Sequence, residues 1–390
     1  MKVALFGMFG VGNLGNEASL DAMLRAVRAR VPGAGLVLVC PNPEAAHLLH
    51  GVRAVPTTTP AASRVARRLP LVRDLPSWRH ALRTLRGVDL LVVPGTGILD
   101  DFGTGPGGLP WDLFRWCAAA RLCGARVAFV SVGAGPIHHR LSRLLMTAAV
   151  RLAGYRSFRD PGSKAYMAGA GCDTSRDTVA PDLVFGLPLP GATERRAADA
   201  PLLVGLNAMA YYGWSHDPAR GQEIHRAYTG KLAAFAQWLL DEGHQVRLFI
   251  GEDRDLTACR ALHDRVGALL PARDARSLHE LLAQFAETDL VVATRFHNVV
   301  AALLLAKPVL SIGYAVKNDE LMADVGQGAF CQAIEELDVV RLKEQFRQLR
   351  AERERIAAAI AERTRAYRAA LDAQDRVLFG ASSGAADRDQ

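Results

Sequence analysis

The stretch KVALFGMFGVGNLGNEASL, residues 2 to 20, decides the fold because three patterns follow one another in it. It opens with a short apolar run and continues with a loop punctuated by glycines. It ends where apolar residues begin to recur at helical spacing, at Leu20, Met23, Leu24 and Val27. A buried strand that turns directly into an amphipathic helix is half of a βαβ unit. The stretch therefore predicts a parallel sheet covered by helices.

Short apolar runs alternate with helical patterns along the rest of the chain, in two series. Most runs are rich in β-branched residues and bounded by glycine or proline, as buried parallel strands are. The first series predicts strands at 2–6, 36–40, 89–93, 126–132 and 155–158, and the second at 202–207, 245–250, 289–293 and 308–314. The sequence thus predicts two Rossmann-like α/β domains. Two such domains that face each other place a ligand in a central cleft, between the carboxyl ends of their sheets.

The boundary between the two series lies at LPLPGATERRAADAP, 187–201. Three prolines, a glycine and mixed charges replace any periodic pattern there, which is typical of a linker. We therefore expect an N-terminal domain at 1–188 and a C-terminal domain at 202–334. The charged segment 335–390 has high helix propensity up to Phe379 and then a polar tail. A chain of 390 residues is also longer than one hydrophobic core commonly supports.

Composition excludes several classes of protein. No stretch of about 18 apolar residues and no secretory leader pattern occurs in the sequence, so a cytoplasmic protein is expected. The six cysteines are scattered without metal-type or redox-type spacing, which predicts neither disulfides nor zinc. The adjacent carboxylates Asp100 and Asp101 point different ways in a loop, so no metal site is expected at all.

The net charge of +7 is uneven along the chain. Between Gly51 and Gly87 the single acidic residue Asp74 stands against eight arginines: Arg53, Arg64, Arg67, Arg68, Arg73, Arg79, Arg83 and Arg86. Such a segment could attract an acidic glycan or the anionic inner face of a membrane, as a peripheral protein, or it could be a solvated surface. Nucleic acid is not expected as a partner, because no recognised binding motif accompanies the arginines. A homo-oligomer remains open.

The opening loop looks at first like a dinucleotide fingerprint, since Gly7, Gly10, Gly12 and Gly15 punctuate a strand-to-helix turn. No G-x-G-x-x-G occurs at the correct register, and no acidic residue ends the second strand to bind a ribose. The polar residues at the helix entrance are Asn13, Asn16 and Glu17. They predict a hydrogen-bonding surface instead of a pyrophosphate site.

Two further strand ends carry chemistry. TRFHN places Arg295 and His297 between a buried strand and the apolar helix NVVAALLLA. An arginine beside helix amides can bind an anion, and a histidine can exchange a proton near neutral pH. The same pair could instead cap the helix and satisfy local carbonyls. At RDPGS, Asp160 is placed to cap a helix that begins with Pro161, and Ser163 adds a hydroxyl.

Five motifs in order resemble the polysaccharide pyruvyltransferase family: GNLGNEASL, SVGAGPI, YRSFRDPGS, APDLVF and TRFHNVVAALLLAKPVLSIGYAVK. The resemblance covers roughly residues 1 to 330. It implies a fold similar to the two-domain GT-B glycosyltransferases. It also implies transfer of the enolpyruvyl group of phosphoenolpyruvate to two hydroxyls of a sugar, which forms a pyruvate ketal. Phosphoenolpyruvate is then a co-substrate, and no cofactor is needed.

The resemblance assigns roles to particular residues. The family's arginine-x-histidine motif matches Arg295 and His297, with His297 as acid or base or, alternatively, as a group that orients phosphate. Phosphoenolpyruvate carries a phosphate and a carboxylate, so its site needs cationic donors. The expected donor-binding residues, at the ends of strands and loops, are Arg159, Ser163, Arg295 and Lys317.

The opening loop then becomes the acceptor side, which binds a sugar, an oligosaccharide or a lipid-linked glycan. The acceptor-binding residues would be Gly12, Asn13, Asn16 and Glu17. Asn16 replaces the aspartate usual in the family. If that aspartate caps the helix, asparagine does the same work, and if it is a base, activity changes.

Tyr211, Tyr212 and Trp214 could stack on a sugar ring or pack in the core. Two other classes of function stay open, namely a GT-B glycosyltransferase that uses a nucleotide sugar and a noncatalytic carbohydrate-binding relative.

Overall fold

The structure, a computed structural model, describes residues 1–59, 74–101, 103–190, 201–213, 217–273, 275 and 277–380. Several sequence predictions therefore fall outside the described residues. They concern Trp214, most of the predicted linker 187–201, the polar tail after Gly380, and four of the eight clustered arginines: Arg64, Arg67, Arg68 and Arg73.

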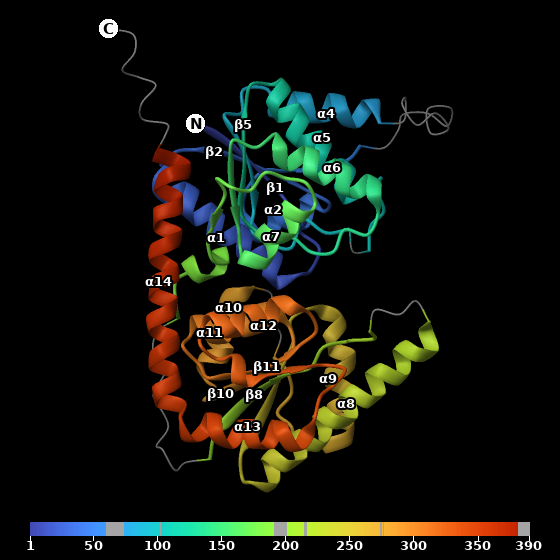
Figure 1. The fold of residues 1–390 in the computed structure, drawn as a ribbon, viewed down its shortest axis with the longest axis vertical. Coiled ribbons are helices and arrows are strands. Elements are labelled where there is room, and N and C mark those ends of the chain that lie inside the picture. The colour runs from blue at the N-terminus through green and yellow to red at the C-terminus, as the bar shows by residue number, and fades with distance from the viewer. Residues whose placement is uncertain are drawn as a thin grey trace. The chain divides into compact units, whose positions relative to one another are not determined.

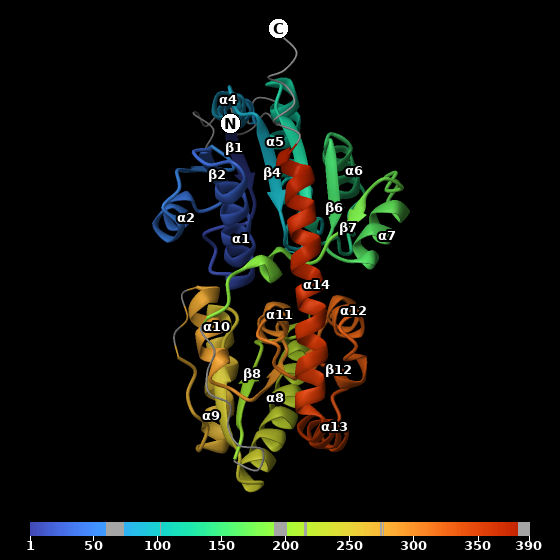
Figure 2. The ribbon, with the colours of Figure 1, turned by 90° about the vertical axis from the view of Figure 1, so that its left-hand side faces the viewer.

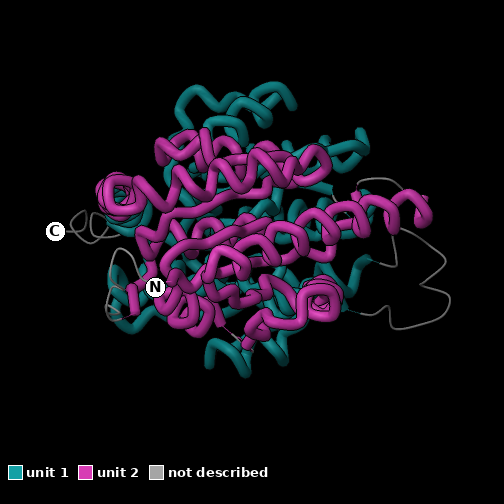
Figure 3. The backbone as a smooth tube through the Cα atoms, turned by 90° about the horizontal axis from the view of Figure 1, so that it is seen from below, with its two compact units in different colours: residues 1–186, 369–390 teal, residues 187–368 magenta. Residues whose placement is uncertain are grey.

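The chain forms two compact units, coloured separately in Figure 3. Met1–Gly186 and Ala369–Gln390 form the first unit, and Leu187–Arg368 form the second. The long helix α14 (Arg353–Gly380) contributes its beginning to the second unit and its end to the first. Each unit has its own parallel sheet (Figure 1). The predicted fold class, two parallel α/β sheets with a C-terminal helical segment, is confirmed.

The first unit has a seven-stranded sheet in the order β3-β2-β1-β4-β5-β6-β7. All the neighbouring strands pair in parallel. The strands are β1 (Lys2–Phe6), β2 (Gly35–Cys40), β3 (Ala54–Pro56), β4 (Leu90–Pro94), β5 (Arg126–Val132), β6 (Tyr155–Phe158) and β7 (Thr178–Val179). The edge strands β3 and β7 were not predicted, since each is too short to show a pattern. The order reverses between β1 and β4, so the loops after these two strands flank the switch point of the sheet.

Helices cover both faces of this sheet. The helices are α1 (Leu14–Arg30), α2 (Pro43–His50), α4 (Leu75–Leu85), α5 (Leu109–Leu122), α6 (Arg140–Arg151) and α7 (Pro161–Gly169), with the short helix η2 at Leu183–Gly186. Figures 1 and 2 place α1 on the opposite face from α4, α5 and α6. The core between the sheet and α5 includes the fully buried Trp116 and Phe129.

The second unit has a five-stranded parallel sheet in the order β12-β11-β10-β8-β9. Its strands are β8 (Leu203–Asn207), β9 (Gln245–Phe249), β10 (Leu290–Ala293), β11 (Val309–Gly313) and β12 (Cys331–Ala333). Its helices are α8 (Pro218–Asp241), α9 (Leu256–Val266), α10 (Leu278–Ala286), α11 (Phe296–Leu304), α12 (Val316–Asp324) and α13 (Val339–Ala351), with short turns at Asp253–Asp255 (η3) and Gly328–Phe330 (η4). Here the order reverses between β8 and β10, which places the switch point there.

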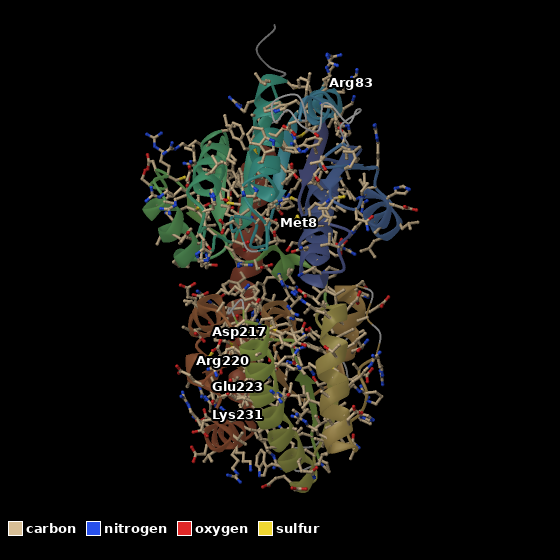
Figure 4. The ribbon with its side chains drawn as sticks, turned by 90° about the vertical axis from the view of Figure 1, so that its right-hand side faces the viewer. Met8, Arg83, Asp217, Arg220, Glu223 and Lys231 are labelled. Carbon is tan, nitrogen blue, oxygen red and sulfur yellow. The ribbon has the colours of Figure 1, made fainter. Side chains whose placement is uncertain are left out.

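Capping residues decide where helices of this unit begin. The helical pattern in the sequence is evident only around Lys231 to Glu242, but α8 begins at Pro218, where Asp217 accepts a hydrogen bond from the Ala219 N–H. Figure 4 labels Asp217 and Lys231 along this helix. In the same way α13 begins after Asp338, which accepts from the Val340 and Arg341 N–H groups.

No described helix is both long enough and apolar enough to cross a membrane. The six cysteines are free thiols. Within the described ranges, no group of three histidine, cysteine or carboxylate side chains is arranged to hold a metal ion.

Candidate functional site

The polar side chains of the second unit gather at its switch point, at the carboxyl ends of β8 and β10. Asn207 is the last residue of β8, and its side-chain Oδ1 accepts hydrogen bonds from the N–H groups of Thr294 (3.2 Å) and Arg295 (2.9 Å). Its Nδ2 donates to the Phe249 carbonyl at the end of β9, 3.0 Å away. One buried amide therefore fixes the turn between β10 and α11 against both neighbouring strands.

A buried tyrosine completes this turn. The Tyr228 hydroxyl, on α8, lies 2.8 Å from the Thr294 Oγ1 and accepts from the Met209 N–H. Burial raises the pKa of Tyr228 to about 12, so its hydroxyl stays protonated at neutral pH. The loops after β8 and β10 are thus joined through one neutral hydroxyl.

The centre of the site is Asp255, a fully buried carboxylate that the sequence analysis missed. Its Oδ1 accepts from the Ala210 N–H at 3.0 Å, and its Oδ2 accepts from the N–H groups of Gly251 and Glu252, each at 3.2 Å. Asp255 therefore ties the loop after β8 to the loop after β9. A buried carboxylate is stable only when such donors surround it.

Arg295 supplies the positive charge beside Asp255. Its Nε donates to the Asp255 Oδ2 at 2.9 Å and its Nη2 to the Asp255 Oδ1 at 2.6 Å, a two-pronged pair. Its Nη1 lies 3.1 Å from the Glu252 Oε1. Burial alone would lower the pKa of Arg295, but the hydrogen bonds and charges of these carboxylates raise it above its ordinary value. The guanidinium is therefore charged, with its charge already balanced inside the protein.

The close approach of Arg295 requires a glycine. A Cβ at Gly251 would lie 2.8 Å from the Arg295 Cγ and 3.2 Å from the Arg295 Cβ. Any other residue at this position would push the arginine stem away from its carboxylates. The predicted role of Arg295 in binding a donor anion is thus joined by a second role, that of holding three loops together.

Lys317 and His297 lie on the two helices that start at this edge. The Lys317 Nζ lies 5.4 Å from the centre of the Phe296 ring and 4.9 Å from that of Tyr314. The half-buried His297 packs edge-on against the Phe296 ring, with 5.3 Å between ring centres. Lys317 and His297 thus both lie beside the ring of Phe296, the residue that follows Arg295.

The helix starts are suited to an anion. Neither α11 nor α12 has a side-chain cap on its first turn. The residue before α12 is Ala315, which has no side-chain acceptor, and no described acceptor takes the N–H of Val316 or Lys317. Uncapped N–H groups at a helix start, beside a lysine, form a typical anion site.

The opening loop of the first unit is closed on itself. Asn13 is the N-cap of α1, and its Oδ1 accepts from the N–H groups of Gly15 and Asn16. Asn16 does not cap the helix, because its Nδ2 donates to the Met8 carbonyl at 3.0 Å. The Glu17 carboxylate is buried, where it accepts from the Gly10 N–H at 2.7 Å and lies 2.9 Å from the His50 Nε2. Gly12 is exposed at the tip of the loop.

Arg159 and Ser163 lie at the carboxyl end of β6, also in the first unit. The Arg159 Nη1 lies 3.4 Å from the Asp182 Oδ2, and the Arg159 Nε lies 3.5 Å from the Asp160 Oδ2. The guanidinium also packs against Gly133, where a Cβ would lie only 2.6 Å from the Arg159 Nη2. The buried Ser163 hydroxyl accepts from the Ala134 N–H at 2.9 Å. Asp160 caps α7 through the Ser163 N–H, as predicted. The four predicted donor-binding residues thus divide between the two units.

The aromatic residues after β8 are partly used in packing. Tyr211 is buried, and its hydroxyl donates to the Glu335 Oε1 at 2.6 Å. Tyr212 is 38% exposed, and its ring stacks on His225 with 4.6 Å between ring centres. One face of Tyr212 is therefore covered, and Trp214 lies outside the described residues.

The sequence analysis missed the two carboxylate partners of Arg295, and it also missed Asn207. GEDRDL, which follows the predicted strand 245–250, places three carboxylates at a strand end, and that pattern could have pointed to Asp255 and Glu252. For Asn207, the signal is a polar residue that ends a fully apolar strand.

A family model described as "Polysaccharide pyruvyl transferase" matches residues 13–315. A comparison with curated protein sequences found no match. Among solved structures, HepE from Anabaena in complex with UDP and glucose is 16% identical, with a TM-score of 0.58, and the alignment covers 98% of this chain and 100% of HepE.

Two further structures share this architecture. MnaA from S. aureus, solved with UDP, is 11% identical, with a TM-score of 0.58 and coverage of 93% of this chain and 90% of MnaA. The lipopolysaccharide outer core galactosyltransferase WaaB is 10% identical, with a TM-score of 0.54 and coverage of 96% and 100%. At these identities the likeness establishes the fold, which is GT-B-like.

Proposed function

The chain belongs to the polysaccharide pyruvyl transferase family, and we propose that it transfers the enolpyruvyl group of phosphoenolpyruvate to two hydroxyls of a sugar. The product is a pyruvate ketal on a polysaccharide or on a lipid-linked precursor, and the second product is phosphate. Family membership makes the protein a transferase. The substrate pair and the ketal chemistry are our proposal.

The reaction balances without a redox partner. A proton adds to the methylene carbon of phosphoenolpyruvate, and the first sugar hydroxyl adds to the adjacent carbon while a base takes its proton. The carbon–oxygen bond to phosphate then breaks, and the second hydroxyl closes the ring. The two protons lost by the hydroxyls equal the one gained by the methyl group and the one carried away on phosphate.

His297 is the residue that we assign to proton transfer. It lies at the start of α11, and a histidine there can give a proton to carbon or take one from a hydroxyl near neutral pH. Its neighbour Arg295 is charged and held by Asp255, so it supplies a fixed positive field beside the reacting group.

The observation that carries the proposal is the uncapped start of α12 beside Lys317. The N–H groups of Val316 and Lys317 and the Lys317 ammonium can donate hydrogen bonds to a phosphate or carboxylate. They are needed because Arg295 is already paired with Asp255. Arg159 and Ser163 stay proposed donor-binding residues. The proposed acceptor side stays the opening loop, with Gly12, Asn13, Asn16 and Glu17. Hydrogen bonds within this loop fix the exposed backbone around Gly12.

A GT-B glycosyltransferase that uses a nucleotide sugar is the second candidate. Two structural relatives were solved with UDP, one of them also with glucose. The charge balance around Arg295 also suits a ligand less anionic than phosphoenolpyruvate. A noncatalytic carbohydrate-binding protein is the third possibility, which would bind glycan without releasing phosphate.

Calorimetric titration of the full chain with phosphoenolpyruvate, and separately with UDP-glucose, tests the proposal. We expect binding of phosphoenolpyruvate, weakened about tenfold or more by Lys317→Met, because a hydrogen bond to a charged group contributes roughly 1.5 to 3 kcal/mol. Lys343→Met is the matched control, since the Lys343 Nζ also lies over an aromatic ring, 5.5 Å from Trp238, on α13. Binding of UDP-glucose without binding of phosphoenolpyruvate would replace the proposal by the second candidate.

A further inference from the structure

Three neighbouring helices of the first unit, α4, α5 and α6, form an outer layer over one face of the seven-stranded sheet (Figures 1 and 2). We call the solvent side of this layer the α4–α6 surface, defined by its exposed side chains: Leu75, Arg79, Arg83, Arg86, Arg121, Leu122, Arg140, Leu141, Arg143 and Leu144. All residues of these three helices lie in the described part of the chain, whereas residues 60–73, which precede α4, do not.

The α4 part of the surface is a basic stripe. Leu75, Arg79 and Arg83 are spaced by four residues, which places them on one face of α4, and Arg86 is the residue directly after this helix. All four are exposed, and Figure 4 labels Arg83 at the surface of this unit. No described carboxylate forms an ion pair with any of these arginines. The stripe therefore presents uncompensated positive charge to the solvent.

The other two helices add large apolar side chains to the same layer. On α6, Leu141 and Leu144 are 46% and 62% exposed, and each directly follows an exposed arginine in the sequence, Arg140 and Arg143. At the end of α5, Leu122 is 73% exposed beside Arg121. Each of these exposed leucines directly follows an exposed arginine, so apolar and basic side chains occur side by side in the sequence of these helices.

Acidic side chains are absent from the α4–α6 surface for a structural reason. The two carboxylates of this layer, Asp74 before α4 and Asp112 on α5, both bind Arg115, whose side chain is fully buried. Burial raises the pKa of Asp112 to about 6, and the nearby Arg115 opposes this rise. The acidic groups are thus turned inward, and every exposed charge on these helices is positive.

We infer that the α4–α6 surface docks on the anionic face of a lipid bilayer. Arginines attract acidic headgroups over a Debye length, and leucines among them can enter the boundary between headgroups and acyl chains. An acidic polysaccharide would use the arginines but would leave the leucines without a role, so the leucines favour a bilayer. The inference assigns a binding surface and does not depend on the donor that the enzyme uses.

Co-sedimentation of the full chain with vesicles tests the inference. The probes are vesicles of phosphatidylcholine alone and vesicles with added phosphatidylglycerol. We expect binding only to the anionic vesicles, reduced roughly a hundredfold in the combined variant Arg79→Ser, Arg83→Ser and Arg86→Ser, from the usual contribution of a basic residue near such a surface. The control variant Arg226→Ser, Arg260→Ser and Arg365→Ser removes the same charge from exposed sites elsewhere and should bind like the wild type.

The leucines distinguish a bilayer from an acidic polymer. The variant Leu122→Ser with Leu144→Ser should lower vesicle binding about tenfold through lost apolar burial, without changing binding to soluble dextran sulfate. Equal vesicle binding by the wild type and the arginine variant would overturn the inference. So would a leucine variant that binds vesicles like the wild type, because the partner would then be an acidic polymer.

Discussion

Helices α1 and α11 both begin beside the switch point of a parallel sheet, but their first turns are built in opposite ways. At α1, the side chains of Asn13, Asn16 and Glu17 all bind backbone groups of their own loop. At α11, the first turn has no side-chain cap, and the N-cap residue Arg295 directs its guanidinium to Asp255 on another loop.

The difference shows that the polar side chains at one helix start bind their own loop, whereas those at another are held by groups far away in the sequence. In the α1 loop, the polar groups stabilise the loop itself, and Glu17 is buried against His50. At α11, Asn207 and Asp255, which lie at the ends of neighbouring strands, hold the turn through its backbone N–H groups and through the Arg295 side chain. We therefore expect substitutions at α11 and its supports to affect both folding and turnover, and substitutions at α1 to affect mainly stability.

The largest effect is expected for Asp255→Asn. The change removes the negative partner of a buried arginine, and breaking a buried pair in this way costs roughly 3 to 5 kcal/mol. Urea denaturation should show a free energy of unfolding lowered by about this amount. Asp253→Asn, two residues away and exposed, is the control and should change it by less than about 0.5 kcal/mol. If Asp255→Asn unfolds like the wild type, Asp255 does not support the α11 turn.

The next effect concerns chemistry at His297. His297→Ala should lower the rate of phosphate release about a hundredfold or more if this residue transfers a proton, and it should leave phosphoenolpyruvate affinity nearly unchanged. Phosphate release with a suitable acceptor, beside calorimetry on the folded variant, measures both quantities. His263→Ala, at an exposed position on α9, is the matched control. A variant that turns over at the wild-type rate would show that His297 has no part in proton transfer.

The sequence predicted the fold well because both sheets are buried and parallel. Runs such as Leu90–Pro94 and Leu290–Ala293 are apolar throughout, so their pattern does not depend on distant partners. The edge strands β3, β7 and β12 were missed because two or three residues carry no pattern. The start of α8 was missed because a cap, Asp217, set it ahead of the apolar periodicity.

The candidate site could be predicted only where its residues are adjacent in the chain. Arg295 and His297 stand out because they join a buried strand to a buried helix. Their supports do not, since Asp255 is 40 residues from Arg295 along the chain and Asn207 is 88 residues from it. These groups become neighbours only when the strands assemble into the sheet. A single sequence shows where strands end, but it does not show which strand ends lie next to one another.

A smaller effect is expected at the start of α1. Asn13→Ala removes the cap of this helix and should lower the free energy of unfolding by about 1 kcal/mol. Asn13→Ser keeps a capping oxygen and should restore most of that loss. Neither variant should change phosphoenolpyruvate affinity in calorimetry. A tenfold loss of affinity with Asn13→Ala would mean that the α1 loop also serves the donor, and the contrast between the two helix starts would fail.

The smallest effect is expected for Asn16→Asp, which restores the aspartate usual in the family. The new carboxylate cannot donate a hydrogen bond to the carbonyl of Met8, a residue labelled in Figure 4. Loss of this hydrogen bond costs roughly 0.5 to 1.5 kcal/mol. A negative charge in the first turn of α1 offsets this by about 0.3 to 1 kcal/mol. Thermal unfolding should therefore differ little between variant and wild type. Because Asn13 already caps the helix, turnover should also stay within about twofold, a barrier change under roughly 0.5 kcal/mol. A gain of tenfold or more in phosphate release would instead identify position 16 as the site of a catalytic base, which asparagine has removed from this chain.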